Sequence, residues 1–146
     1  MFTADADVTI NRPLEEVFAF TGDASRLSQW QKAVIESRQT SDGPRGVGAT
    51  GVNVRKVMGQ TIETNWEVAA YTVNEGYSVK STAGGPVSYE LTYTFAAVEG
   101  GTRVQASLQA EAKGPLKVME GMIAGSVKQE FAEDHQRLKT LLESGA

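Results

Sequence analysis

The chain contains no cysteine and a single histidine, His135. Without cysteine there can be no disulfide framework, thiol nucleophile or cysteine-based metal site. One histidine without a partner at ligand spacing does not make a zinc site. A Ser-His-Asp triad is not indicated either, because Ser126 lies in a predicted helix and lacks the strand-turn-helix elbow of a catalytic serine. We therefore expect neither metal nor cofactor.

Long apolar runs and an excess of positive charge are also missing. No apolar segment approaches the roughly 20 residues that cross a bilayer, and the N-terminus lacks the features of a signal peptide. A net charge of −4, spread without blocks, disfavours nucleic acid as a partner. We expect a cytoplasmic protein, monomer or homodimer, with no membrane span. With no repeats or linkers, we interpret residues 1–146 as a single domain.

The middle of the chain consists of short segments in which apolar and polar residues alternate. The clearest are residues 62–68, 87–95 and 104–110. In the first, Ile62, Trp66 and Val68 share one face, and Glu63 and Glu67 lie on the other. One apolar and one polar face predict an antiparallel sheet covered on a single side. The connecting turns are short and contain no helices, which excludes a parallel sheet.

Helices are predicted only near the two ends of the chain. Pro13, followed by acidic residues, marks the start of one. Asp23 can cap a second short helix that carries Trp30. A long amphipathic helix is predicted from about residue 116 to residue 143. Because its apolar stripe must be buried, we expect it to lie against the apolar face of the sheet.

These elements carry three motifs in a fixed order. They are Asn11-Arg12-Pro13-Leu14-Glu15-Glu16-Val17-Phe18, Gly100-Gly101-Thr102-Arg103-Val104 and Leu138-Lys139-Thr140-Leu141-Leu142-Glu143. In this order the chain resembles the START-like helix-grip superfamily, most closely its polyketide cyclase/dehydrase-like branch. The resemblance implies an α+β fold in which a seven-stranded curved antiparallel sheet wraps around a long C-terminal helix, with two short helices between strands 1 and 2. It also implies an apolar cavity, but no catalytic residue set.

Residues 46–51 match the dinucleotide-binding pattern G-x-G-x-x-G literally. That motif requires a strand before it and a helix N-terminus after it, so that backbone amides meet the pyrophosphate. Here the segment follows a turn and leads into residues 52–57, which read as a strand. We interpret it as a glycine-rich loop.

Two carboxylates fall on the apolar stripe of the last helix, Glu120 and Asp134. A buried unpaired carboxylate is costly, so each needs an explanation. Asp134 could project into the cavity and exchange a proton with a ligand, or it could pair with Arg137 or a sheet residue. Met119 could take the inward place of Glu120. The two carboxylates cannot form a dyad, because about 21 Å of helix separates them. His135 is expected to be a partly exposed helix residue, and an acid/base role at the rim of the cavity is the alternative.

Aromatic side chains dominate the apolar face of the predicted sheet, and two of them are tyrosines, whose buried hydroxyls need partners. Trp30 could reach the same space.

The third strand raises a further question, because its alternation of inward and outward residues is predicted to break at a bulge-like pair, Arg55 and Lys56. One of the two could point inward. The ligand-binding residues that we predict are Trp66, Tyr89, Leu91, Tyr93, Met119, Ile123, Val127, Phe131 and Asp134.

Two functions fit this pattern. The first is binding of a hydrophobic or aromatic small molecule, lipid- or polyketide-like, between the sheet and the last helix. The alternative is a polyketide cyclase/aromatase or dehydratase, with Asp134 as acid/base and Tyr93 as carbonyl donor. Whether the chain is an enzyme stays open. A third interpretation, a partner-binding domain with a filled core, predicts that no ligand-sized cavity exists.

Overall fold

The computed structural model describes residues 1–57, 59–82 and 85–145. Over these residues the strands form one sheet in the order β1-β7-β6-β5-β4-β3-β2, and every neighbouring pair is antiparallel. The elements are β1 (Phe2–Ile10), α1 (Leu14–Thr21), η1 (Ala24–Arg26), α2 (Leu27–Trp30), β2 (Val34–Gln39), β3 (Thr50–Val57), β4 (Gln60–Thr72), β5 (Gly76–Ser81), β6 (Val87–Val98), β7 (Gly101–Ala112), η2 (Gly114–Met119) and α3 (Glu120–Glu143). The predicted helix-grip fold is confirmed.

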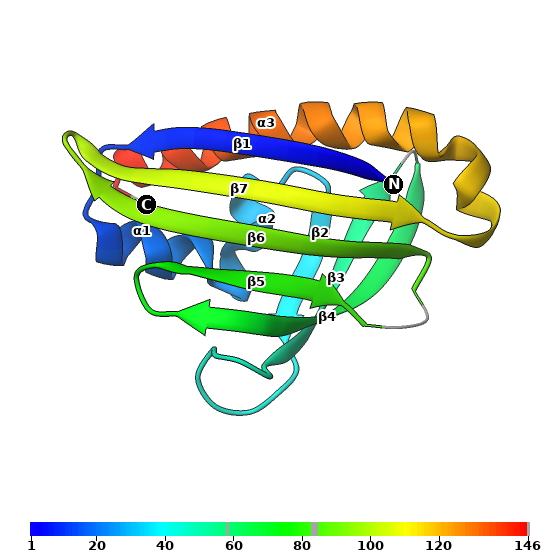
Figure 1. Cartoon of the computed structure of the whole chain (residues 1–146), viewed down its shortest axis with the longest axis horizontal. Helices are drawn as coiled ribbons and strands as arrows, with labels where there is room; N and C mark the ends of the chain where they lie inside the picture. Colours follow the sequence, from blue (N-terminus) through cyan, green and yellow to red (C-terminus); the bar gives the residue numbers. More distant parts are fainter. Residues whose placement is uncertain (58, 83–84, 146) are drawn as a thin grey trace.

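The long helix α3 runs along the length of the curved sheet (Figure 1) and packs against β1 and α2. The short helices α1 and α2 follow β1 and lie on the same side of the sheet as α3. None of the helices in the described parts of the chain combines the length and apolar character of a membrane span.

The alternation predicted for residues 62–68 is present in β4. Ile62, Trp66 and Val68 are buried, and Glu63 is exposed. The same inward face continues through β5, β6 and β7, and α3 covers it with Leu138, which is fully buried. A fully buried leucine contributes roughly 1.5–3 kcal/mol through removal of apolar surface from water. The core therefore lies between one face of the sheet and the inner faces of α1, α2 and α3.

Helix ends follow their local signals. The Asp23 side chain accepts a hydrogen bond from the Ser25 N–H at 3.0 Å, which caps η1, and α2 follows directly. The last helix departs from the prediction at its start. Residues Gly114–Met119 form a 3₁₀ helix, and the α-helix begins only at Glu120. Gly114 has a positive φ of 60°, which turns the chain sharply out of β7.

Strand β3 is more regular than the sequence predicts. It pairs with β4 residue by residue from Thr50 to Val57, so the bulge expected at Arg55 and Lys56 is wrong. The register shift lies instead in β2, between Val34 and Glu36. Because β3 keeps its alternation, its odd-numbered residues 51–57 face the concave side. Gly51 is required there, since a Cβ would stand 2.0 Å from the Trp66 ring.

Candidate functional site

A cavity of about 150 Å³ lies between the concave face of the sheet and the helices α1, α2 and α3. Its presence contradicts the interpretation of the chain as a domain with a filled core. Of the nine residues predicted to bind a ligand, eight line it: Trp66, Tyr89, Leu91, Tyr93, Ile123, Val127, Phe131 and Asp134. The ninth, Met119, packs instead on the neighbouring cluster of Phe2, Ala110, Ala112 and Ile123.

The cavity wall also includes residues that the sequence reasoning did not assign to it. The most important are Gln31, Arg45, Tyr77 and Glu130. His135, for which a place at the cavity rim was the alternative, also lines the cavity. Trp30, which was expected to reach this space, lines the cavity as well, so both tryptophans of the chain are in its wall. The regular alternation of β3 was the signal that could have placed Asn53 and Arg55 there.

His135 is buried, with 2% of its surface exposed, so the prediction of partial exposure is wrong. Its ring packs between those of Trp30, Tyr93 and Phe131, at centroid distances of 5.4, 5.7 and 4.5 Å. Burial lowers the pKa of His135, because a charged imidazolium would lose its hydration. The imidazole is therefore neutral at neutral pH.

Two hydrogen bonds fix the tautomer of His135. Nδ1 lies 2.7 Å from the carbonyl oxygen of Phe131, which can only accept, so Nδ1 carries the proton. Nε2 is then an acceptor, and the Tyr93 hydroxyl donates to it at 2.6 Å. Burial raises the pKa of Tyr93 well above its usual value. The Tyr93 hydroxyl therefore donates its hydrogen bond to His135. Toward any other group, its oxygen can act only as an acceptor.

Asp134 links α3 to the turn that follows α2. Its Oδ1 accepts hydrogen bonds from the Lys32 N–H at 3.1 Å and from Arg137 Nη1 at 2.8 Å. Arg137 also donates to the Trp30 carbonyl at 3.0 Å. Pairing of Asp134 with Arg137, one of the two alternatives above, is confirmed. Burial still raises the pKa of Asp134, because the hydrogen bonds and Arg137 offset only part of the desolvation.

Glu120 has no place in the cavity. Its carboxylate contacts the α-amino group of Met1, accepts from the Ala112 N–H at 3.2 Å and pairs with Lys117. These partners lower the pKa of Glu120, with the contact to the N-terminus as the largest cause. Glu120 therefore connects the start of α3 to the N-terminus, to the end of β7 and to η2.

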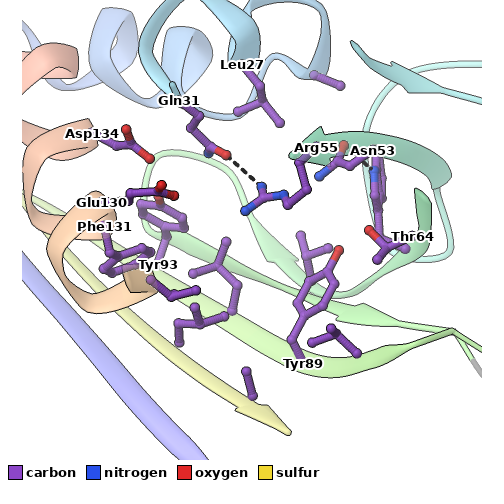
Figure 2. A pocket seen from close by; sticks show the side chains of 18 of the residues that line it. Leu27, Gln31, Asn53, Arg55, Thr64, Tyr89, Tyr93, Glu130, Phe131 and Asp134 are labelled. Atoms are coloured by element: carbon purple, nitrogen blue, oxygen red, sulfur yellow. Dashed lines mark hydrogen bonds between the residues drawn. The ribbon is translucent and has the colours of Figure 1, made fainter. Parts of the chain in front are cut away.

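The polar part of the cavity lies between α2, β3 and α3 (Figure 2). The Arg55 side chain extends into the cavity, and its Nη2 donates to Gln31 Oε1 at 3.0 Å. Lys56, the next residue, is exposed. Glu130 lines the cavity from α3, and burial followed by the neighbouring Asp134 raises its pKa. This part of the wall can bind a polar group, whereas the rest is mostly apolar.

Trp66 and Arg45 form the opposite part of the wall. The Trp66 Nε1 donates to Asn53 Oδ1 at 3.1 Å, and Ser37 donates to the same oxygen at 2.6 Å, which fixes the indole plane. The Arg45 guanidinium lies 5.5 Å from the Trp66 ring and 4.9 Å from the Tyr77 ring. Such cation–π contacts hold a cation in a largely apolar wall.

Across the described ranges, no three histidine, cysteine or acidic side chains lie together in a geometry that would hold a metal ion. The polar side chains that line the cavity carry guanidinium, carboxyl, amide, hydroxyl and imidazole groups.

A curved antiparallel sheet that encloses a cavity against a long C-terminal helix defines the helix-grip fold. The chain belongs to the family described as polyketide cyclase / dehydrase and lipid transport, whose model matches residues 1–143. A search of curated proteins gives no match.

Several solved structures share the fold over almost their full length. A protein from Thermus thermophilus is 19% identical, with a TM-score of 0.82 and coverage of 99% of both chains. A START superfamily protein from Mycobacterium smegmatis is 16% identical, with a TM-score of 0.78 and coverage of 97% of this chain and 99% of that one. A conserved protein from Geobacillus kaustophilus is 16% identical, with a TM-score of 0.77 and coverage of 98% and 96%. At these identities the likeness establishes the fold alone.

Proposed function

We propose that the protein binds a hydrophobic or aromatic small molecule in the cavity between the sheet and α3. The observation that carries this proposal is the cavity itself, which has a mostly apolar wall and a small polar region at Gln31, Arg55 and Glu130. Ligand sites typically combine an apolar wall with a few convergent polar groups. Membership of a family whose description includes lipid transport supports the same function.

The size of the cavity narrows the ligand class. An engineered protein cavity of about 150 Å³ accommodates benzene, and drug-sized ligands occupy pockets of about 300–1,000 Å³. With its volume of about 150 Å³, this cavity fits a single substituted aromatic ring. A long acyl chain or a multi-ring polyketide would require α3 to move away from the sheet.

The test is a fluorescence titration, because both tryptophans lie in the cavity wall. The probes are 4-propylbenzamide and 4-propylbenzoate, which share one apolar body. Binding of at least one should change the tryptophan emission in a saturable manner. Val127→Phe, which fills the cavity, should abolish that change. Met122→Phe is the matched control, because Met122 lies on the same helix and is 65% exposed. Equal binding by both variants would contradict the location of the site.

A cyclase or dehydratase acting on a carbonyl-rich substrate is a second candidate function. One observation favours it: the carboxyl group of Asp134 lines the cavity and has a raised pKa, which suits a general acid. Tyr93 is less suited to donate to a substrate carbonyl, because it donates to His135. Asp134→Asn should then reduce turnover of a polyketide-like substrate far more than its binding. Unchanged turnover in that variant would rule out this role.

A further inference from the structure

Strand β3 places two of its polar residues toward the cavity and two of its valines away from it. Asn53, Arg55 and Val57 line the cavity, whereas Val52 and Val54 lie on the other face of the strand. A shift of one residue would exchange the two faces. Placing a guanidinium in a largely apolar cavity is costly unless it has partners. Asn53 has such partners in Trp66 and Ser37, so Arg55 is the residue whose position needs an explanation.

Arg55 is under-satisfied in the described part of the chain. A guanidinium has five N–H donors, and the hydrogen bond to Gln31 uses one. The two carboxylates nearest in the wall are on α3. Asp134 is paired with Arg137. The charge of Arg55 offsets part of the rise in the pKa of Glu130, so the two are neighbours, but no ion pair joins them among the described residues. Figure 2 shows the Arg55 side chain projecting between α2 and α3 into the cavity.

Gln31 adds to the same polar region. Its Oε1 accepts from Arg55, so the orientation of its amide is fixed and its NH₂ group remains available as a donor. Arg45, in another part of the wall, contributes a second positive charge, and its buried Nε has no hydrogen-bond partner among the described residues. Among the described residues, the cavity wall thus has two guanidinium groups, Arg45 and Arg55, against one carboxylate, Glu130, that is not already paired with Arg137.

We propose that the ligand is an apolar acid whose carboxylate binds the guanidinium of Arg55. This inference rests on the proposed binding function and adds the chemical class of the ligand. A carboxylate matches the planar fork of an arginine and can accept two parallel hydrogen bonds from it. The apolar body of the acid would then lie against Leu91, Val127 and Phe131.

The experiment compares 4-propylbenzoate with 4-propylbenzamide, which have the same shape but differ in charge. Dissociation constants are measured by tryptophan fluorescence and by calorimetry for the wild type, Arg55→Met, Arg55→Lys and Lys56→Met. Lys56→Met is the matched control, because Lys56 is the adjacent residue of β3 and is exposed. Far-ultraviolet circular dichroism and thermal unfolding establish that each variant is folded.

The wild type should bind the benzoate at least about tenfold more tightly than the amide, as expected for hydrogen bonds to a charged group. Arg55→Met should remove this preference, Arg55→Lys should keep part of it, and Lys56→Met should leave it unchanged. Equal affinities in the wild type, or a preference that survives in folded Arg55→Met, would overturn the inference while leaving the binding function intact. If neither probe binds the wild type, both the inference and the proposed function fail.

Discussion

The N-terminal half of α3 (residues 120–131) and its C-terminal half (residues 132–143) differ in how many of their side chains are buried. In the C-terminal half, Asp134, His135, Leu138 and Leu142 are buried. Arg12 also donates to the Leu142 carbonyl at 2.8 Å, which ties this end of the helix to the chain beyond β1. In the N-terminal half, only Ile123 is buried to a comparable degree.

The N-terminal half also contains two glycines, Gly121 and Gly125. A Cβ atom at either position would meet nothing within 4 Å, so packing does not require glycine there. Each glycine weakens the helix by roughly 0.5–1 kcal/mol relative to alanine. Ile123 and Val127 of this half and Asp134 and His135 of the other half all line the cavity, so the cavity wall spans both halves. Because the N-terminal half has fewer buried side chains and two glycines, we expect it to open more easily than the C-terminal half.

The largest effect is expected for Leu138→Ala. Leu138 has no exposed surface, and truncation of a buried leucine costs about 2–5 kcal/mol through lost burial and the space left behind. Met122→Ala, at an exposed position of the other half, should change stability by no more than about 0.5 kcal/mol. Urea unfolding of both variants checks this contrast. Similar losses at the two positions would show that the halves contribute equally.

A smaller loss, about 1–2 kcal/mol at neutral pH, is expected for Arg137→Met. This change leaves the buried Asp134 carboxylate without its cation, although partial exposure of Arg137 reduces the cost. The loss should decrease as the pH falls and Asp134, whose pKa is already raised, becomes protonated. Lys128→Met, at an exposed position of α3, is the control. A loss that does not depend on pH would mean that Asp134 is not the group affected.

His135 should make stability fall on mild acidification. Its pKa in the folded protein is lowered from the usual value of about 6.5. At a pH below about 6.5 the histidine of the unfolded chain takes up a proton, whereas His135 in the folded protein does not. The free energy of unfolding is therefore highest above this pH and decreases as the pH falls through it. The slope can reach about 1.4 kcal/mol per pH unit. Chemical unfolding between about pH 5.5 and 7 should show this slope in the wild type and a flatter one in His135→Gln. Equal slopes would contradict the assignment.

The smallest effect is expected for the two glycines of α3. Gly121→Ala and Gly125→Ala should each stabilise the protein by about 0.5–1 kcal/mol, since helix propensity improves and nothing clashes. If the N-terminal half opens for ligand exchange, the double variant should also release 4-propylbenzoate more slowly in stopped-flow measurements. Stabilisation without slower release would place the entry route elsewhere.

The sequence was most predictive where one physical signal acted alone. Alternation in residues 62–68 predicted the inward face of β4, and the pattern along the chain predicted the order of strands and helices. The prediction of a broken phase in β3 was wrong, because the strand is regular. The expectation that Arg55 or Lys56 could point inward is confirmed for Arg55.

His135 was misplaced for a different reason. Histidine is often partly exposed, and only the rings of Trp30, Tyr93 and Phe131, brought together from three separate elements, make its burial favourable. Met119 was expected in the cavity wall because the α-helical periodicity was extended into η2, where 3₁₀ geometry rotates the side chains differently.

Native mass spectrometry of the purified protein, followed by solvent extraction, tests most directly whether the cavity between the sheet and α3 holds a ligand. We predict a stoichiometric small-molecule adduct that is an apolar acid and that is absent from the Val127→Phe variant. A bare mass for the wild type, together with no uptake from a mixture of aromatic and aliphatic acids supplied in excess, would contradict a ligand-binding function for this cavity.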